Sequence, residues 1–193
     1  MRRVFTLSFS IALLAAGLLA ACDLQPYGET SGLDLEWARE IADERVAADY
    51  GDGWYLVSFD AEYLDYDAHL YTPHDFSYWG FSYYNGAECE LWVWVLRDGD
   101  VIVWEILPHD TDALPDAYDS ADVRAWLTTA RQCYRRLSGR EDDVCYTLYV
   151  WFISYSSYDY TSASIDFYDA GLERLARCSL NADTGEVYDF RLD

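Results

Sequence analysis

Hydrophobic and polar positions predict a helix followed by four strands in the first half of the chain. A helical period runs from about residue 34 to residue 50, and Gly51 follows where a helix commonly ends. The dipeptides Asn85-Gly86 and Asp98-Gly99 are typical turns of β-hairpins. Alternating or continuously apolar runs predict strands near 54–64, 77–84, 88–97 and 100–107.

The same order of elements recurs in the second half. Ser120 is expected to be the N-cap of a second helix, which Gly139 terminates. One face of this helix is apolar and carries Val123, Trp126, Leu127, Ala130, Cys133, Tyr134 and Leu137. Strands are predicted near 144–155, 162–168, 172–181 and 186–192.

Glycines at the predicted turns correspond between the two halves at nearly equal offsets, which indicates a duplicated unit. The predicted fold class is α+β, with two tandem units that each pack one helix on an antiparallel meander of three or four strands. The first unit is expected over 33–107 and the second over 120–193. Between them, 108–119 is rich in proline and aspartate and is interpreted as an acidic linker.

Two segments resemble the PepSY domain. The ending NADTGEVYDF is similar to the last hairpin of that family, and EWAREIADERVAADYG is similar to its opening helix. The resemblance implies tandem PepSY-like domains, each with a helix on an antiparallel sheet. It also implies an extracytoplasmic role in binding or restraining other proteins, peptidases above all, and it carries over no catalytic residue.

Two tryptophans mark a second apolar face in the first unit. In a two-residue loop at 98–99, Val93 lies opposite Trp104 on the face that the first helix is expected to cover. Trp92 and Trp94 then point to the other face, which needs a cover of its own. Either this face is buried where the two units pack together, or it is an exposed platform for a partner or a sugar.

The first residues have the pattern of a secretory signal. Arg2 and Arg3 precede an apolar run that is too short to span a bilayer, and small residues follow. Leu19-Ala20-Ala21-Cys22 resembles the lipobox of bacterial lipoproteins, so 1–21 is expected to be removed as a signal peptide. Cys22 would then carry lipid, palmitate included, while 22–32 serves as a tether.

This reading predicts a location and a partner. The protein is expected on the extracytoplasmic side of the cell membrane, attached through its N-terminal lipid. In a host with two membranes, Asp23 resembles the signal for retention in the inner membrane. The alternative is an ordinary signal peptide, with Cys22 left as a plain thiol.

Charge narrows the partners further. All 35 acidic residues follow Cys22, whereas two of the 13 basic residues precede it. A surface this acidic repels nucleic acid, so no nucleic-acid partner is expected. Three arginines nevertheless share the polar side of the second helix: Arg124, Arg131 and Arg135. They are interpreted either as a solvated face paired with nearby acids or as a docking stripe for an acidic envelope partner.

With Cys22 assigned to lipid, four cysteines remain, which in an oxidising compartment favours two disulfides. Cys133 near the end of the second helix and Cys145 at the next strand make an easy pair. That pairing leaves Cys89 and Cys178 to clamp the two units together.

Motifs of catalysis are missing from the sequence, so an enzyme is not expected, and neither a cofactor nor a metal is predicted. The acidic linker fails the EF-hand pattern, although a weak calcium site there stays open. The leading functional hypothesis is a membrane-anchored protein-binding or inhibitor module. The alternative is a carbohydrate-binding or cell-wall-binding lipoprotein that uses an exposed platform of Trp92 and Trp94.

Overall fold

A computed structural model of the chain describes residues 35–71, 77–86, 89–107, 112–115, 117–155 and 158–193. The described elements are α2 (Leu35–Tyr50), β1 (Tyr55–Leu64), β2 (Tyr78–Tyr84), β3 (Glu90–Leu96), β4 (Val101–Ile106), α3 (Ser120–Ser138), β5 (Cys145–Tyr155), β6 (Tyr158–Tyr168), β7 (Arg174–Asn181) and β8 (Val187–Leu192). The predicted order of helices and strands is therefore confirmed. Signal peptide, Cys22 and tether lie outside the described residues.

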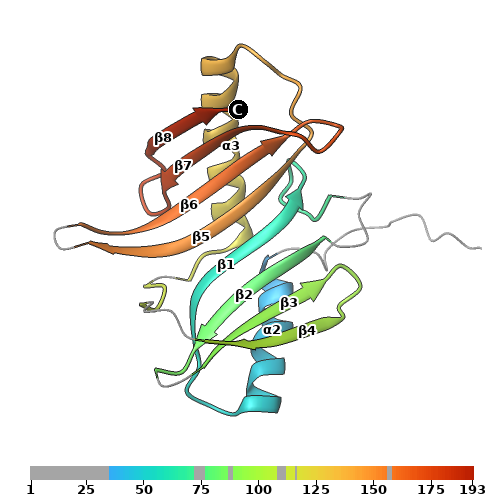
Figure 1. Ribbon diagram of the computed structural model, residues 1–193, viewed down its shortest axis with the longest axis vertical. Coiled ribbons are helices and arrows are strands. Elements are labelled where there is room, and N and C mark those ends of the chain that lie inside the picture. Colours follow the sequence, from blue (N-terminus) through green and yellow to red (C-terminus); the bar gives the residue numbers. More distant parts are fainter. Residues whose placement is uncertain (1–34, 72–76, 87–88, 108–111, 116, 156–157) are drawn as a thin grey trace, which may run out of the picture. The chain divides into compact units, whose positions relative to one another are not determined.

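The predicted fold class of two separate units is wrong. All eight strands form one antiparallel sheet in the order β4-β3-β2-β1-β5-β6-β7-β8 (Figure 1). Strands β1 and β5 pair directly at its centre, with Phe59 opposite Val150 and Ala61 opposite Leu148. Residues 31–193 accordingly make one compact unit, so 33–107 and 120–193 are not separate domains.

Both helices lie on the same side of this sheet, behind it in the view of Figure 1. Helix α2 packs on β2, β3 and β4, and α3 packs on β6, β7 and β8. Their apolar faces share a single buried core with the inward residues of the strands. Neither of these two described helices lies over the opposite face of the sheet, which is called the open face below.

The N-terminal ends of the two helices meet near the middle of the molecule. The Leu35 amide of α2 donates to Ser120 Oγ over 3.1 Å, and the Ser120 amide donates to Glu36 Oε1 over 2.8 Å. The predicted N-cap is one residue off, because Asp119 caps α3 through a reciprocal capping box with Asp122. Ser120 instead joins one helix to the other.

Segment 108–119 was expected to be a linker, but its described residues are attached to the fold. The Leu114 amide donates to the carbonyl oxygen of Leu56 over 2.9 Å. The ring of Tyr118 packs against those of Phe59 and Trp126, with centroids 6.4 and 5.1 Å away. These contacts bind the connection to β1 and α3, which removes the hinge that a linker would provide.

Strand β4 pairs with β3 in a register one residue away from the predicted one. Three residues form the loop, because the Leu96 amide donates to the Asp100 carbonyl oxygen over 2.8 Å. Trp104 is consequently opposite Trp92, not Val93. A slip of one residue moves every side chain of a strand to the other face. Trp104 therefore joins Trp92 and Trp94 on the face without helices.

Candidate functional site

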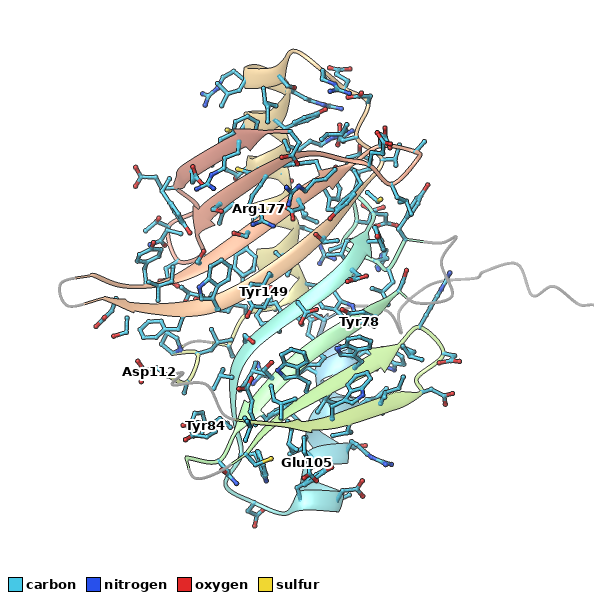
Figure 2. All side chains as sticks on the ribbon, in the orientation of Figure 1. Tyr78, Tyr84, Glu105, Asp112, Tyr149 and Arg177 are labelled. Carbon is cyan, nitrogen blue, oxygen red and sulfur yellow. The ribbon has the colours of Figure 1, made fainter. Side chains whose placement is uncertain are left out.

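A shallow depression with aromatic walls, called the aromatic trough, runs across the middle of the open face of the sheet. Alternation along the strands places one set of side chains toward the helices and the next toward this face. The side chains of Tyr78, Tyr149 and Arg177 all project from the open face toward the viewer (Figure 2). Strands from both halves of the sheet therefore contribute side chains to the open face, and the strand register determines which side chains these are.

Two rows of directly paired residues cross four strands and build the trough. The first row runs Trp94, Gly80, Asp60, Tyr149 from β3 to β5. The second row runs Trp92, Ser82, Ser58, Trp151 over the same strands. Each row has a large aromatic residue at both ends and small or short side chains between them. The walls stand three strand spacings apart, about 14 Å at the backbone.

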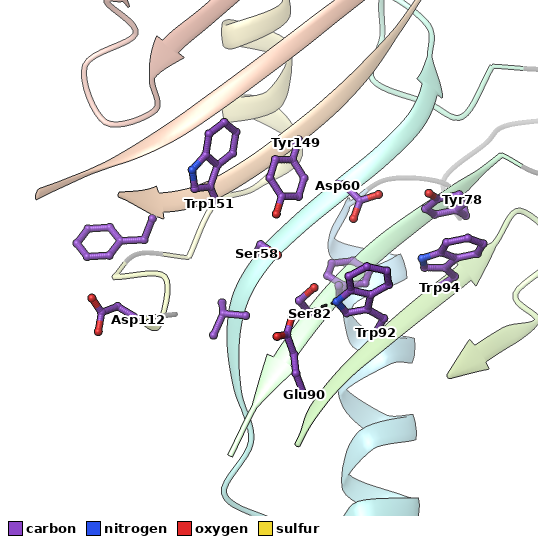
Figure 3. Close-up of a pocket in the computed structure, with 13 residues that line it drawn as sticks. Ser58, Asp60, Tyr78, Ser82, Glu90, Trp92, Trp94, Asp112, Tyr149 and Trp151 are labelled. Atoms are coloured by element: carbon purple, nitrogen blue, oxygen red, sulfur yellow. Dashed lines mark hydrogen bonds between the residues drawn. The ribbon is translucent and has the colours of Figure 1, made fainter. Parts of the chain in front are cut away.

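The space between these walls is a pocket of about 430 Å³. Figure 3 shows Tyr149 and Trp151 along one side of it, Trp92 and Trp94 along the other, and Ser58 and Asp60 between. Such a volume falls in the usual range for sites that bind small molecules. The pocket is lined by Val57, Ser58, Asp60, Tyr78, Phe81, Ser82, Glu90, Trp92, Trp94, Asp112, Tyr149, Trp151 and Phe152.

Asp60 is an acid of the pocket whose pKa is strongly shifted. Burial, followed by repulsion from Glu62, raises the pKa of its carboxyl to about 7, although a hydrogen bond from Tyr78 opposes the rise. The carboxyl group lies over Gly80, where an added Cβ would come within 2.5 Å of Oδ1. The glycine thus makes room for an acid that titrates near neutral pH.

Tyr78 links this acid to the aromatic wall. Its hydroxyl donates to Glu62 Oε1 over 3.2 Å and lies beside Asp60, and burial together with these two carboxylates raises its pKa. Its ring is stacked on Trp94, with centroids 4.0 Å apart and planes 9° from parallel. Trp104 meets Trp94 edge to face at 4.3 Å. These contacts hold the Trp94 side of the trough in one arrangement.

The wall residue Trp92 combines a fixed edge with an open ring. Its Nε1 donates to Glu90 Oε1 over 3.0 Å, and Glu90 itself is buried. The side chain nevertheless remains 41% exposed. Across the trough, Tyr149 is 46% exposed and its ring packs against that of Trp151 at 4.8 Å. Fixed orientation with exposed ring surface is the arrangement expected of a contact site.

The remaining part of the open face, over β6 to β8, is different because its polar groups pair with one another. Arg177 makes two hydrogen bonds to the carboxylate of Asp166, at 2.7 and 2.6 Å. Ser164 and Ser179 bond each other over 2.7 Å. Arg174 pairs with the same Asp166 at 3.6 Å. Arg174 and Arg177 lie on β7, two strands beyond β5 at the margin of the trough, and are both engaged by Asp166 of β6.

Of the predicted binding residues, Trp92 and Trp94 line the trough. The interpretation in which their face is buried between two units is wrong, because the two halves share one sheet and leave this face open. The serines, Gly80 and Asp60 were missed. Small residues alternating with aromatic ones at 58–60 and 80–82 were the available signal, but only the pairing of β1 with β5 turns them into a floor.

The three arginines of the predicted stripe lie on α3 as expected, away from the trough. Arg131 pairs with the buried Asp143 at 3.0 Å, and its guanidinium lies over the ring of Tyr66. Arg124 donates weakly to the Asp67 carbonyl oxygen at 3.4 Å, and Arg135 stands 4.0 Å from Glu141. These local partners favour the solvated-face interpretation over a docking stripe. Arg131 has a structural part to play, because it ties α3 to the start of β5.

The cysteines that the structure brings together are not the predicted pairs. Cys89 precedes β3 and Cys178 lies on β7, with four strands between them, so a disulfide joining the two is geometrically excluded. Cys178 lies beside Cys133 of α3, and burial followed by the proximity of that thiol raises the pKa of the Cys178 thiol to about 12. Cys145 opens β5 opposite Tyr168. All four are thiols in the structure.

Within the described ranges, no group of three or more histidine, cysteine, aspartate or glutamate residues is arranged to hold a metal ion. No helix in this part of the chain is both long and apolar enough to cross a membrane. No protein-family model matches the chain, and no curated protein or solved structure matches it either. The resemblance to PepSY domains stays a prediction.

Proposed function

We propose that the chain is a carbohydrate-binding lipoprotein of the extracytoplasmic side, with the aromatic trough as its binding site. The observation that carries the proposal is the pair of rows in which Trp92 and Trp94 face Trp151 and Tyr149 across a floor of small polar residues. A role in binding without catalysis is part of the proposal.

The chemistry of the trough fits a sugar. The faces of a pyranose ring present C–H bonds, which carry a slight positive charge and pack well against the negative face of an indole. Its rim presents hydroxyl groups, which need hydrogen-bond partners when they leave water. Exposed rings at Trp92 and Tyr149 supply the first kind of contact, and Ser58, Asp60 and Glu90 supply the second.

A protein partner held by the arginines of α3 has less support. Arg131 is already engaged by Asp143, and a docking acid would have to displace that buried partner. The arginines on the open face of the sheet are paired as well. The trough, in contrast, offers aromatic surface and polar groups in a concave site, which is the usual form of a small-ligand site.

Attachment through Cys22 belongs to the same proposal, supported by the lipobox pattern at 19–22. A protein expressed with Cys22→Ser would lose its acyl chains and move from the detergent phase to the aqueous phase on Triton X-114 partition. The unchanged chain should stay in the detergent phase. Equal partition of both proteins would overturn the anchor and leave the trough proposal standing.

Binding is tested by calorimetry with a panel of oligosaccharides and the full chain in detergent micelles. Trp92→Ala should weaken binding by about 2 kcal/mol, the usual cost of truncating an aromatic anchor. Tyr188→Ala is the matched control, because Tyr188 is similarly exposed on the same face but lies at the β8 edge. The recovered sugar should be intact. No binding by any oligosaccharide, or equal effects of the two variants, would overturn the proposal.

A further inference from the structure

Every charged side chain that lines the trough is acidic. Asp60 comes from β1, Glu90 from β3 and Asp112 from the connection to α3. Glu62 adds a fourth carboxylate next to Asp60, joined to it through the hydroxyl of Tyr78. Among the described residues of the lining there is no lysine, arginine or histidine.

Two of these acids, Asp60 and Glu90, are shielded from bulk water. Glu90 is 4% exposed, and the Asp60 carboxyl lies over the β2 backbone at Gly80 and beside the hydroxyl of Tyr78. Burial disfavours a carboxylate, and a second carboxylate nearby disfavours it further. Elsewhere on the same face an equivalent acid has a cation, since Asp166 is held by Arg177 and Arg174. Asp60, in contrast, has no such ion pair among the described residues.

We propose that the trough selects sugars that carry a free ammonium group, that is, unacetylated amino sugars, and rejects sugar acids. This inference rests on the carbohydrate-binding role proposed above and names the class of sugar. The ammonium would lie over the floor, near Asp60 and between the aromatic walls. It supplies the positive charge that the described lining lacks.

Two independent features of the walls and floor favour this ligand. A cation is attracted to the face of an indole, and the walls hold Trp92, Trp94 and Trp151. A charge-assisted hydrogen bond to a carboxylate is about twice as strong as a neutral one. Uronic acids and the lactyl acid of muramic residues would place like charges side by side, which weakens binding. The trough therefore disfavours the anionic glycans of a cell wall.

Three trisaccharide probes test the selection, all at pH 7.5 with the full chain in detergent micelles. The first is the unacetylated glucosamine trimer, whose protonated amines keep the N–H donors that a carboxylate can accept. The second is the neutral N-acetylglucosamine trimer, and the third is an anionic galacturonate trimer. Calorimetry should give at least tenfold tighter binding of the cationic trimer than of the neutral one, with the anionic trimer weakest.

Two variants assign the preference to the trough. Asp60→Asn keeps the shape of the side chain and should reduce the preference for the cationic trimer about tenfold. Glu186→Gln makes the same charge change in the exposed β7–β8 turn and should leave the preference intact. Circular dichroism of each variant establishes that the fold is retained.

Each outcome supports or overturns a defined claim. Equal affinities for the cationic and neutral trimers would overturn the ammonium selection while leaving carbohydrate binding in place. Tetramethylammonium binding as tightly as the cationic trimer would overturn the carbohydrate role and retain recognition of the cation. Failure of all probes to bind would overturn both proposals.

Discussion

The carboxyl group of Asp60 occupies the space that a side chain at Gly80 would fill. These residues are directly paired between β1 and β2, and an added Cβ at Gly80 would lie 2.5 Å from Asp60 Oδ1 and 2.8 Å from Cγ. The floor of the trough is therefore built by one acid lying over one glycine, and any larger residue at position 80 has to move the acid.

Replacing Gly80 by alanine is expected to turn the Asp60 carboxyl outward into the pocket. Overpacking of this kind destabilises by about 1–3 kcal/mol. Because the displaced group gains water, its pKa should fall from about 7 toward the ordinary value of 3.8. Denaturant unfolding measures the first effect and carbon NMR titration of the carboxyl measures the second. Gly171→Ala in an exposed turn is the control, and an unchanged Asp60 pKa in Gly80→Ala would contradict the packing argument.

Stability of the protein should fall between about pH 4 and pH 7 through the same residue. The folded chain keeps the proton of Asp60 up to about pH 7, whereas the unfolded chain releases it near 3.8. Over that window the unfolded state binds fewer protons, so raising the pH favours unfolding until the folded carboxyl has also ionised. Ionisation of Asp60 should lower the free energy of unfolding by on the order of 2 kcal/mol, a value that allows for solvent around this partly exposed carboxyl.

Asp60→Asn removes this titration and serves as the test. The variant should gain stability relative to the parent chain as the pH rises from 4.5 to 8, measured by urea unfolding at several pH values. Glu62 and Tyr78, which face Asp60, stay in place in both proteins. A stability difference that is constant over this range would show that Asp60 does not titrate there.

The ion pair between Arg131 and Asp143 should matter more than any other arginine contact on α3. Asp143 is buried and also accepts hydrogen bonds from Tyr66 and Tyr146, both at 2.9 Å. Removing the cation leaves a buried charge without its ion-pair partner, which costs about 3 kcal/mol. Arg131→Leu should therefore lower the unfolding midpoint strongly, whereas Arg135→Ala, whose partner is exposed at 4.0 Å, should change it by about 0.5 kcal/mol or less.

A double variant separates the two explanations of that cost. If the loss arises from the stranded charge, adding Asp143→Asn to Arg131→Leu should recover part of it. Additive losses would mean instead that the arginine acts through packing against Tyr66. Ligand binding in the trough should be unchanged in Arg131→Leu, in Asp143→Asn and in the double variant, because α3 covers the other face of the sheet.

Local elements were predictable from the sequence, but their assembly was not. Helical periods and turn glycines located α2, α3 and the strands within a few residues, because those signals are local. The pairing of β1 with β5 joins Phe59 to Val150 across a long stretch of chain. Each of these strands alternates like any half-buried strand, so nothing in it distinguishes a neighbour in its own repeat from one in the other.

The candidate site residues likewise include some that local sequence patterns reveal and others that only the strand pairing reveals. Trp92 and Trp94 were identified because their strand carries large apolar residues on both faces, and a single helix can cover only one of them. Asp60 drew no attention among 35 acids, since its special environment depends on Gly80 in the adjacent strand. The one-residue error in the β3–β4 loop also hid Trp104, because the Asp98-Gly99 dipeptide is compatible with loops of two or three residues.

A disulfide between Cys133 and Cys178 is expected when the protein is exposed to a thiol oxidant. Cys133 and Cys178 are neighbouring buried thiols on α3 and β7, so oxidised glutathione added during refolding, before the thiols are buried, would join them by thiol–disulfide exchange and be reduced to two glutathione thiols. Closing this loop should stabilise the fold by about 3–4 kcal/mol. Peptide mapping without reductant should find Cys133 linked to Cys178, and the gain should vanish in Cys178→Ser but persist in Cys89→Ser. Recovery of Cys133 linked to Cys145 would show that α3 and β7 do not pack as described.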